Sequence, residues 1–142
     1  MKWQHWQFAF RHNLHHVVAS MGRRLQSMSD TLSSEIRQIA RMAQTTGDRL
    51  MTEEATKTAL VMPFLKALGY NVFDPGIVIP EFIADHGIKN GEKVDYAICI
   101  NDQVQIPIEC KQYKSELNIL NESQLFRYFS VTTVRFAILT NG

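Results

Sequence analysis

The chain has 142 residues, of which 45% are hydrophobic, and its formal net charge is +1. This length and apolar content predict one domain with a single core, and the balanced charge provides no global basic field for a nucleic-acid partner. Two cysteines are too few for a disulfide framework, so we expect free thiols and a cytoplasmic protein. No apolar run is long enough to span a bilayer.

Residues 1–29 differ in composition from the rest of the chain. They include no Asp or Glu, but they hold both tryptophans and four of the five histidines. We interpret them as a basic, aromatic N-terminal extension that is weakly structured, and residues 30–142 as the folded domain. A membrane-surface helix or a transit-peptide-like segment is a second interpretation of this composition. The histidines have no Cys or carboxylate nearby and are expected to be solvated rather than to bind metal.

Two helices are predicted before the first strand. The first has apolar residues at helical spacing over residues 32–43, Ser33 or Ser34 as its N-cap, and Gly47 after its end.

The second helix should extend from the N-cap Thr52 to Gly69, with enough apolar positions for one buried face. Pro63 should kink it or remove one backbone hydrogen bond. Glu53 and Glu54 lie in its first turn, where acidic side chains interact favourably with the helix dipole, and that effect alone could explain them.

After Gly69 the hydrophobic period changes to two, which is typical of strands. Turns are predicted at Asp74-Pro75-Gly76, Asn90-Gly91 and Asn101-Asp102. Three antiparallel strands are predicted over residues 78–84, 93–100 and 104–111. A helix is expected from Asn121 onward, and a last strand over residues 134–142. We therefore predict an α/β domain with an αβββαβ core, in which a mixed central sheet is flanked by helices.

Alternation along the second and third strands places two acids opposite each other. The residues expected to point at the core are Val94, Tyr96, Ile98 and Ile100 on one strand and Val104, Ile106, Ile108 and Cys110 on the next. Both sets can share a face only if the loop has three residues, 101–103, or if a bulge shifts the register. Asp95 then stands opposite Glu109, with Lys111 two residues further on. Pro107 also indicates an irregular strand.

Two carboxylates that face each other across neighbouring strands suit a hard divalent cation, Mg²⁺ or Mn²⁺. Such an ion lowers the pKa of a bound water and neutralises charge that develops on a phosphate. A lysine beside the carboxylates can orient that water or stabilise the transition state. The alternative is a surface ion pair between Glu109 and Lys111, next to a solvated Asp95.

Several short segments occur in an order that resembles a known family. "VDYAI", "PIECK", "SQLFRYF" and "RFAILTNG" follow "TEEATKTALVMPFLKALGYNVFDP". Together they resemble the N-terminal nuclease domain of type I restriction enzyme R subunits, within the PD-(D/E)xK nuclease superfamily. The resemblance covers Thr52 through Gly142. It implies a restriction-endonuclease-like core and a Mg²⁺-dependent endonuclease that hydrolyses phosphodiester bonds in DNA. It also implies partner subunits for specificity and methylation.

The resemblance implies roles for individual residues. Asp95 and Glu109 match the metal-binding acids, together with the backbone carbonyl of Cys110, and Lys111 matches the catalytic lysine. Glu53 matches an acid in the family's first helix, and Glu54 is a competing assignment.

A second group of residues is expected to touch DNA or assist catalysis. Gln124 and Tyr128 match a Gln-x-x-x-Tyr element, and their spacing puts them on one helix face, where both could reach a phosphate or Lys111. Lys114 and Arg127 are expected to contact the DNA backbone.

The sequence departs from the family in several ways. Val94 stands where some members have proline, no Walker-type phosphate loop is present, and the domain is expected to end early. A non-catalytic DNA-binding or assembly module with the nuclease fold, left over from a restriction system, is therefore an alternative. A nuclease of repair or junction resolution is a third reading. Metal binding would distinguish the non-catalytic module from the restriction endonuclease. Substrate choice would distinguish the nuclease of repair or junction resolution.

Overall fold

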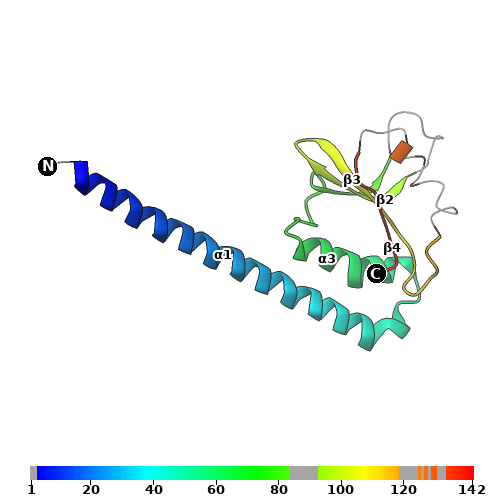
Figure 1. Ribbon diagram of the computed structural model, residues 1–142. Helices are drawn as coiled ribbons and strands as arrows, with labels where there is room; N and C mark the ends of the chain where they lie inside the picture. Colours follow the sequence, from blue (N-terminus) through cyan, green and yellow to red (C-terminus); the bar gives the residue numbers. More distant parts are fainter. Residues whose placement is uncertain (1–2, 84–92, 119–124, 126, 128, 131–133) are drawn as a thin grey trace.

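The structure is a computed structural model, and it describes residues 3–83, 93–118, 125, 127, 129, 130 and 134–142, with side chains from residue 20 onward. A long helix leads into a small α/β unit, in which a shorter helical segment packs against a four-stranded mixed sheet (Figure 1). The predicted α/β class is confirmed. In the part of the chain described here, no helix is long and apolar enough to cross a membrane.

Helix α1 (Trp3–Thr46) is continuous over 44 residues. It passes through the expected boundary at residues 29 and 30, so Ser33 and Ser34 lie inside the helix, and the prediction that one of them caps it is wrong. The division into an extension and a domain stays a prediction. The last turns of α1 contact the helical segment of the α/β unit, and its earlier turns project away (Figure 1).

Gly47 follows α1, as predicted, and begins the short 3₁₀ turn η1 (Gly47–Arg49). A Cβ atom at position 47 would lie 2.5 Å from Cε1 of Tyr113. Only glycine allows this close approach, which brings the end of α1 against the segment that follows the third strand.

The second predicted helix consists of three consecutive pieces: α2 (Glu53–Thr56), the π-helical turn η2 (Lys57–Val61) and α3 (Met62–Ala67). Thr52 caps it as predicted, because its Oγ1 accepts a hydrogen bond from the N–H of Ala55 at 3.0 Å. At the other end, Gly69 has φ +96°, and the N–H groups of Gly69 and Tyr70 donate to the carbonyls of Lys66 and Leu65. These two bonds form a Schellman motif.

The disturbance expected at Pro63 takes the form of the π-helical turn η2. Proline has no N–H, and in an α-helix its ring clashes with the carbonyl four residues before it. The wider π-helical turn lies immediately before the proline segment and changes the hydrogen-bond pattern there.

The strand order in the sheet is β1-β2-β3-β4. β1 (Val78–Phe82), β2 (Val94–Ile100) and β3 (Gln103–Cys110) form the predicted antiparallel meander, and β4 (Ile138–Thr140) pairs with β3 in parallel. The described residues between β3 and β4 that are helical, as expected, are Leu125, Arg127, Phe129 and Ser130. The predicted Asn90-Gly91 turn and Asn121 cap lie outside the described residues.

The register of β2 and β3 is the one that the apolar pattern predicts. Tyr96 pairs with Ile108, which places Asp95 opposite Glu109 where the ladder ends. The connecting turn has only the residues 101–102, both with positive φ (52° and 59°), as in a type I′ hairpin. A bulge between this turn and the Ile98–Ile106 pair shifts the register. The bulge is therefore the correct alternative, and the three-residue loop is wrong.

Pro107 lies within β3, between two neighbouring strands, without interrupting it. The backbone N–H of Lys111 donates to the carbonyl of Thr140 in β4 at 2.7 Å. N–H groups alternate in direction along a strand, so an N–H group at position 107 would also point toward β4. Pairing with β4 starts only at Ile108. The missing N–H of Pro107 thus falls just before that ladder begins, where its loss is tolerated.

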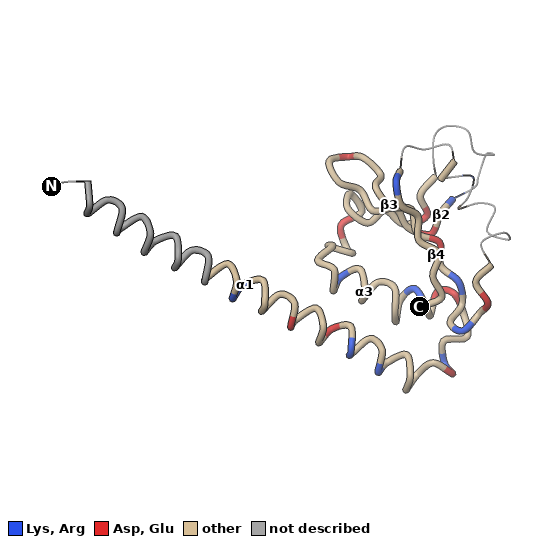
Figure 2. Tube along the Cα trace, viewed as in Figure 1, with Lys and Arg blue, Asp and Glu red and all other residues tan. Residues whose placement is uncertain are grey.

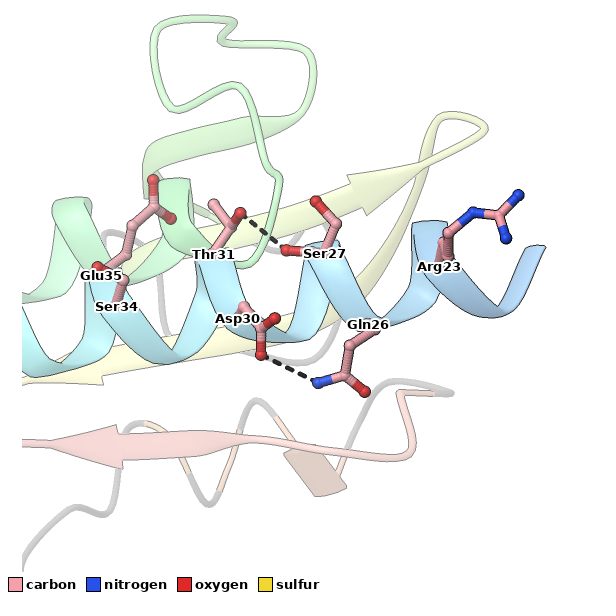
Figure 3. A pocket seen from close by; sticks show the side chains of 7 residues that line it. All are labelled: Arg23, Gln26, Ser27, Asp30, Thr31, Ser34 and Glu35. Carbon is pink, nitrogen blue, oxygen red and sulfur yellow. Dashed lines mark hydrogen bonds between the residues drawn. The ribbon is translucent and has the colours of Figure 1, made fainter. Parts of the chain in front are cut away.

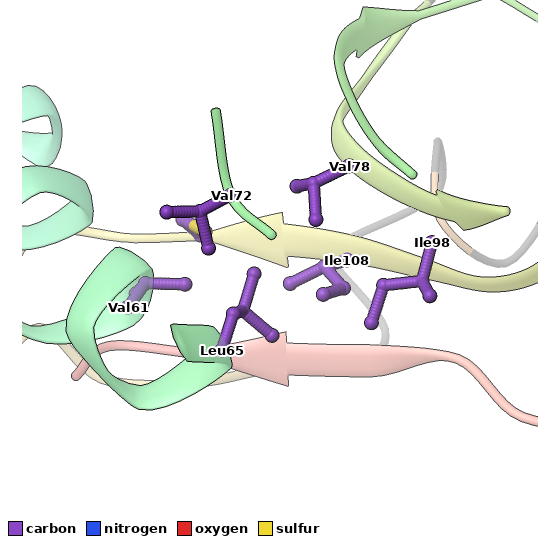
Figure 4. Packing of buried hydrophobic residues seen from close by; sticks show 7 residues of the cluster. Val61, Leu65, Val72, Val78, Ile98 and Ile108 are labelled. Atoms are coloured by element: carbon purple, nitrogen blue, oxygen red, sulfur yellow. The ribbon is translucent and has the colours of Figure 1, made fainter. Parts of the chain in front are cut away.

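Buried side chains lie on both faces of the sheet. The larger cluster joins η2 and α3 to the strands and comprises Val61, Leu65, Val72, Val78, Ile98, Ile108 and Cys110 (Figure 4). A second cluster contains Val94 and Leu125, with Phe82, Val104 and Leu139 against it. The predicted core faces are correct for the middle of the two strands. Beyond the bulge, Val104 joins the second cluster, and Ile100 is exposed.

Replacing Leu65 by alanine should lower the free energy of unfolding by about 2–5 kcal/mol, because Leu65 is only 1% exposed and a cavity would remain. Urea denaturation measures this loss. The matched control is Phe64→Ala on the same turn, since Phe64 is 39% exposed. Equal losses in the two variants would contradict the packing described here.

Candidate active site

Positions occupied by acidic and by basic residues lie near each other where one end of the sheet meets the helical segment (Figure 2). Thr56 fixes this junction. Its Oγ1 accepts a hydrogen bond from the N–H of Tyr113 at 2.8 Å and donates one to the carbonyl of Thr52 at 3.1 Å. Because Thr56 is fully buried, these bonds hold the start of the helix beside the segment that follows β3.

Lys57 extends from η2 to Asp95 near the start of β2. Its Nζ lies 2.5 Å from Asp95 Oδ1, 2.7 Å from Glu54 Oε1 and 3.4 Å from Glu53 Oε1. Only 6% of the Lys57 side chain and 10% of the Asp95 side chain are exposed. Removing one partner from a buried ion pair of this kind costs about 3–5 kcal/mol.

The surroundings of Lys57 keep it charged. Burial alone would lower the pKa of Lys57, but hydrogen bonds to Asp95 and Glu54 and the negative charges of these two groups outweigh burial. The pKa of Lys57 is therefore raised above its ordinary value. A permanent positive charge thus stands among three carboxylates.

The carboxylate of Asp95 is held from two directions. Oδ1 contacts Lys57, and Oδ2 accepts a hydrogen bond from the backbone N–H of Cys110 at 2.7 Å. An ionised carboxylate has about four lone-pair positions. Each oxygen of Asp95 can therefore still accept a further ligand while it keeps its present contact.

Glu109 and Lys111 form a second ion pair, with Lys111 Nζ 2.9 Å from Glu109 Oε1. Glu109 is buried, at 7% exposed, and Lys111 is half-buried. Both predicted metal-binding carboxylates are therefore largely withdrawn from solvent, which differs from the simple surface ion pair considered above.

The donor atoms of this site suit a hard cation. Four carboxylates, from Glu53, Glu54, Asp95 and Glu109, accompany the two ammonium groups of Lys57 and Lys111, which leaves two negative charges among these six groups. Carboxylate and carbonyl oxygens are the ligands that Mg²⁺ and Mn²⁺ prefer. Among the described residues, no group of three or more His, Cys, Asp or Glu side chains is arranged to hold a metal ion. Any such ion would therefore rest on the carboxylate pair and backbone oxygens.

Of the predicted residues, Glu53 and Asp95 both contact Lys57, and Lys111 contacts Glu109; strand pairing sets Asp95 opposite Glu109. Lys114 is exposed, with its Nζ 3.5 Å from Asp48 Oδ1 and 5.4 Å from the ring centroid of Tyr113. Arg127 is half-buried in the helical residues before β4. The predicted Gln124 and Tyr128 lie outside the described residues.

Sequence reasoning missed Lys57, although two signals mark it. It lies three and four residues after Glu54 and Glu53, where side chains meet on a helix. It also lies three and four residues before the buried Leu60 and Val61, which places a lysine on the buried face.

A depression on α1 lies apart from these charged residues (Figure 3). Its lining comes from one helix and consists of exposed residues: Arg23, Gln26, Ser27, Asp30, Thr31, Ser34 and Glu35. Its polar groups bond locally, with Gln26 donating to Asp30 at 3.0 Å and Thr31 to the carbonyl of Ser27 at 2.9 Å. This surface therefore does not contribute to the candidate active site.

A comparison with family models matches residues 52–142 to the family described as "Type I restriction enzyme R protein N terminus". The match begins at the N-cap Thr52 and includes the helical segment, the four strands and every charged residue of the site. The chain belongs to this family. Comparisons with curated proteins and with solved structures give no match.

Burial raises the pKa of the Cys110 thiol from 9.0 to about 12, and the charge of Asp95 adds to the shift. Because the unfolded chain loses this proton first, the free energy of unfolding should be fully retained below about pH 9 and should fall as the pH rises toward 12. Urea denaturation at pH 8 and pH 10 measures the fall. The fall should be smaller in Cys110→Ala, and an identical fall in both proteins would contradict the assignment.

Proposed function

We propose that this domain is a metal-dependent DNA endonuclease that hydrolyses phosphodiester bonds within a type I restriction system. The observation that carries the proposal is the placement of Asp95 and Glu109 on paired strands, both shielded from solvent, with Lys111 on Glu109. The family supports the restriction context, and the four-stranded sheet with its helices is compatible with the PD-(D/E)xK nuclease core.

In this proposal the oxygens of Asp95, Glu109 and the Cys110 carbonyl hold one Mg²⁺ or Mn²⁺ ion. When bound, the ion lowers the pKa of a water molecule and neutralises charge on the phosphate. Asp95 is suited to this task because its contacts with Lys57 and the Cys110 N–H limit rotation of the carboxylate. Glu53, 3.4 Å from Lys57, supports the same cluster from the helix.

Lys111 supplies positive charge on the solvent side of the site. Its side chain is 27% exposed, whereas that of Glu109 is 9% exposed, so a DNA strand can approach the ammonium group. A lysine in this position can orient the attacking water or stabilise the charge of the transition state. Gln124, Tyr128, Lys114 and Arg127 remain the proposed contacts to the DNA strand.

The proposed partners are DNA and the specificity and methylation subunits of a restriction system. The net charge of +1 provides little general attraction to DNA. This agrees with a domain that other subunits deliver to its substrate.

One observation favours the alternative of a non-catalytic DNA-binding or assembly module. Asp95 already has one oxygen on Lys57 and the other on the Cys110 N–H, as a purely structural carboxylate would. Metal binding separates the two proposals, because a structural carboxylate cluster would bind neither Mg²⁺ nor Mn²⁺.

Lys111→Ala should reduce DNA cleavage by about 10²- to 10³-fold, the usual effect of removing one group that stabilises the transition state. The assay follows nicking of supercoiled plasmid DNA in Mg²⁺ or Mn²⁺, with EDTA as the metal-free reference. Lys66→Ala is the matched control, since Lys66 is an exposed lysine of α3. Full activity of a folded Lys111→Ala protein would remove the proposed role of Lys111. No cleavage by the unaltered protein would contradict the endonuclease proposal.

Asp95→Asn should weaken Mn²⁺ binding at least tenfold, because the substitution removes a ligand charge and changes the shape of the side chain little. Isothermal titration calorimetry measures this, with circular dichroism to verify folding. Asp102→Asn, in the turn at the opposite end of β2, is the matched control and should bind Mn²⁺ like the unaltered protein. Equal Mn²⁺ affinities of the Asp95 and Asp102 variants would place the ion elsewhere.

A further inference from the structure

The ammonium group of Lys57 stands among carboxylates whose negative charges it offsets. Its Nζ is 2.5–3.4 Å from carboxylate oxygens that come from two separate parts of the chain, Glu53 and Glu54 on the helix and Asp95 on β2. The side chains of Lys57 and Asp95 are 6% and 10% exposed, so water screens this pair weakly, whereas those of Glu53 and Glu54 are 39% and 77% exposed.

We infer that Lys57 is a built-in counter-ion: it assembles the carboxylates before a divalent ion binds, and its charge weakens the binding of that ion. This inference rests on the proposed metal-dependent function. It assigns to Lys57 a positioning role that is distinct from the role proposed for Lys111, whose ammonium pairs with Glu109.

The assembling role follows from the charges on the two elements. α2 presents Glu53 and Glu54 toward the end of the sheet where Asp95 lies, and these carboxylates would repel one another without a positive group between them. The Thr56–Tyr113 hydrogen bond keeps the helix in place but carries no charge. Lys57, the residue after Thr56, supplies the positive charge that offsets these carboxylates.

The weakening role follows from the shared carboxylate. A divalent ion on either oxygen of Asp95 would share that group with the ammonium of Lys57, which contacts Oδ1 directly. Two like charges on one buried carboxylate disfavour each other, and part of the negative charge of Asp95 is already neutralised. Without the charge of Lys57, the site should therefore attract a divalent ion more strongly.

The test compares three full-length variants with the unaltered protein. Lys57→Met keeps the apolar stem and removes the charge, whereas Lys57→Gln also keeps an N–H that can donate to Asp95. Lys66→Met is the matched control, an exposed lysine on the same helical segment. Mn²⁺ affinity is measured by calorimetry, and thermal unfolding is followed in EDTA and in saturating Mn²⁺.

We expect both Lys57 variants to unfold several degrees lower in EDTA, to bind Mn²⁺ at least tenfold more tightly, and to regain most of the lost melting temperature in Mn²⁺. The control should match the unaltered protein. If a Lys57 variant is unfolded in EDTA, refolding on addition of Mn²⁺ supports the inference, and failure to refold in Mn²⁺ overturns it.

Three other results would overturn the inference. The first is that the Lys57 variants melt in EDTA at the same temperature as the unaltered protein. The second is that they melt at a lower temperature but bind Mn²⁺ no more tightly than the unaltered protein, and the third is that no variant binds Mn²⁺. Plasmid cleavage by the unaltered protein tests the proposed function separately. If the unaltered protein cleaves plasmid DNA but the Lys57 variants bind Mn²⁺ no more tightly, only this inference is overturned. If the Lys57 variants bind Mn²⁺ more tightly but the unaltered protein does not cleave DNA, only the nuclease proposal is overturned.

Discussion

The ion pair between Lys57 and Asp95 is the interaction on which the site depends. It joins the helical segment made of α2, η2 and α3 to β2, and it does so with little exposure to solvent. The uncharged bond from Tyr113 to Thr56 reinforces the same junction one residue earlier. The apolar cluster around Leu65 sets the distance between helix and sheet, while these polar contacts set the position along the strand. Stability and the geometry of the acids are therefore coupled.

The strand pairing provides the rest of the site. Glu109 lies opposite Asp95 because the two-residue turn is combined with a bulge. Together they give the register that the apolar side chains require. Asp95 is thereby placed beside the N–H of Cys110, to which it bonds at 2.7 Å. A carboxylate thus accepts a bond from the backbone of β3 at the point where the ladder ends. Asp95 and Glu109 are thus held by the sheet, whereas the counter-charge of Asp95 comes from the helix.

Much of this arrangement could be predicted from the sequence. The Thr52 cap, the antiparallel meander and the opposition of Asp95 and Glu109 follow from local rules, since capping, turn chemistry and two-residue alternation act over a few neighbours. The length of α1 was not predicted, because its polar and charged positions are compatible with both a helix and a weakly structured segment. The Lys57 contact with Asp95 was missed for another reason. It joins residues 38 positions apart, and no local rule specifies how a helix turns when it docks on a sheet.

The π-helical turn shows how one helical segment meets two different demands. Each residue of an α-helix advances the side-chain direction by about 100°, so one additional residue rotates everything before it by about that angle relative to everything after it. Downstream of η2, Leu65 points into the apolar cluster, while Lys57, at its first position, points to the acids at the end of the sheet. In an uninterrupted α-helix the side chains of Lys57 and Leu65 would point about 80° apart, and one extra residue brings these directions to within about 20° of each other. Both side chains can therefore face the sheet without a break in the backbone between them.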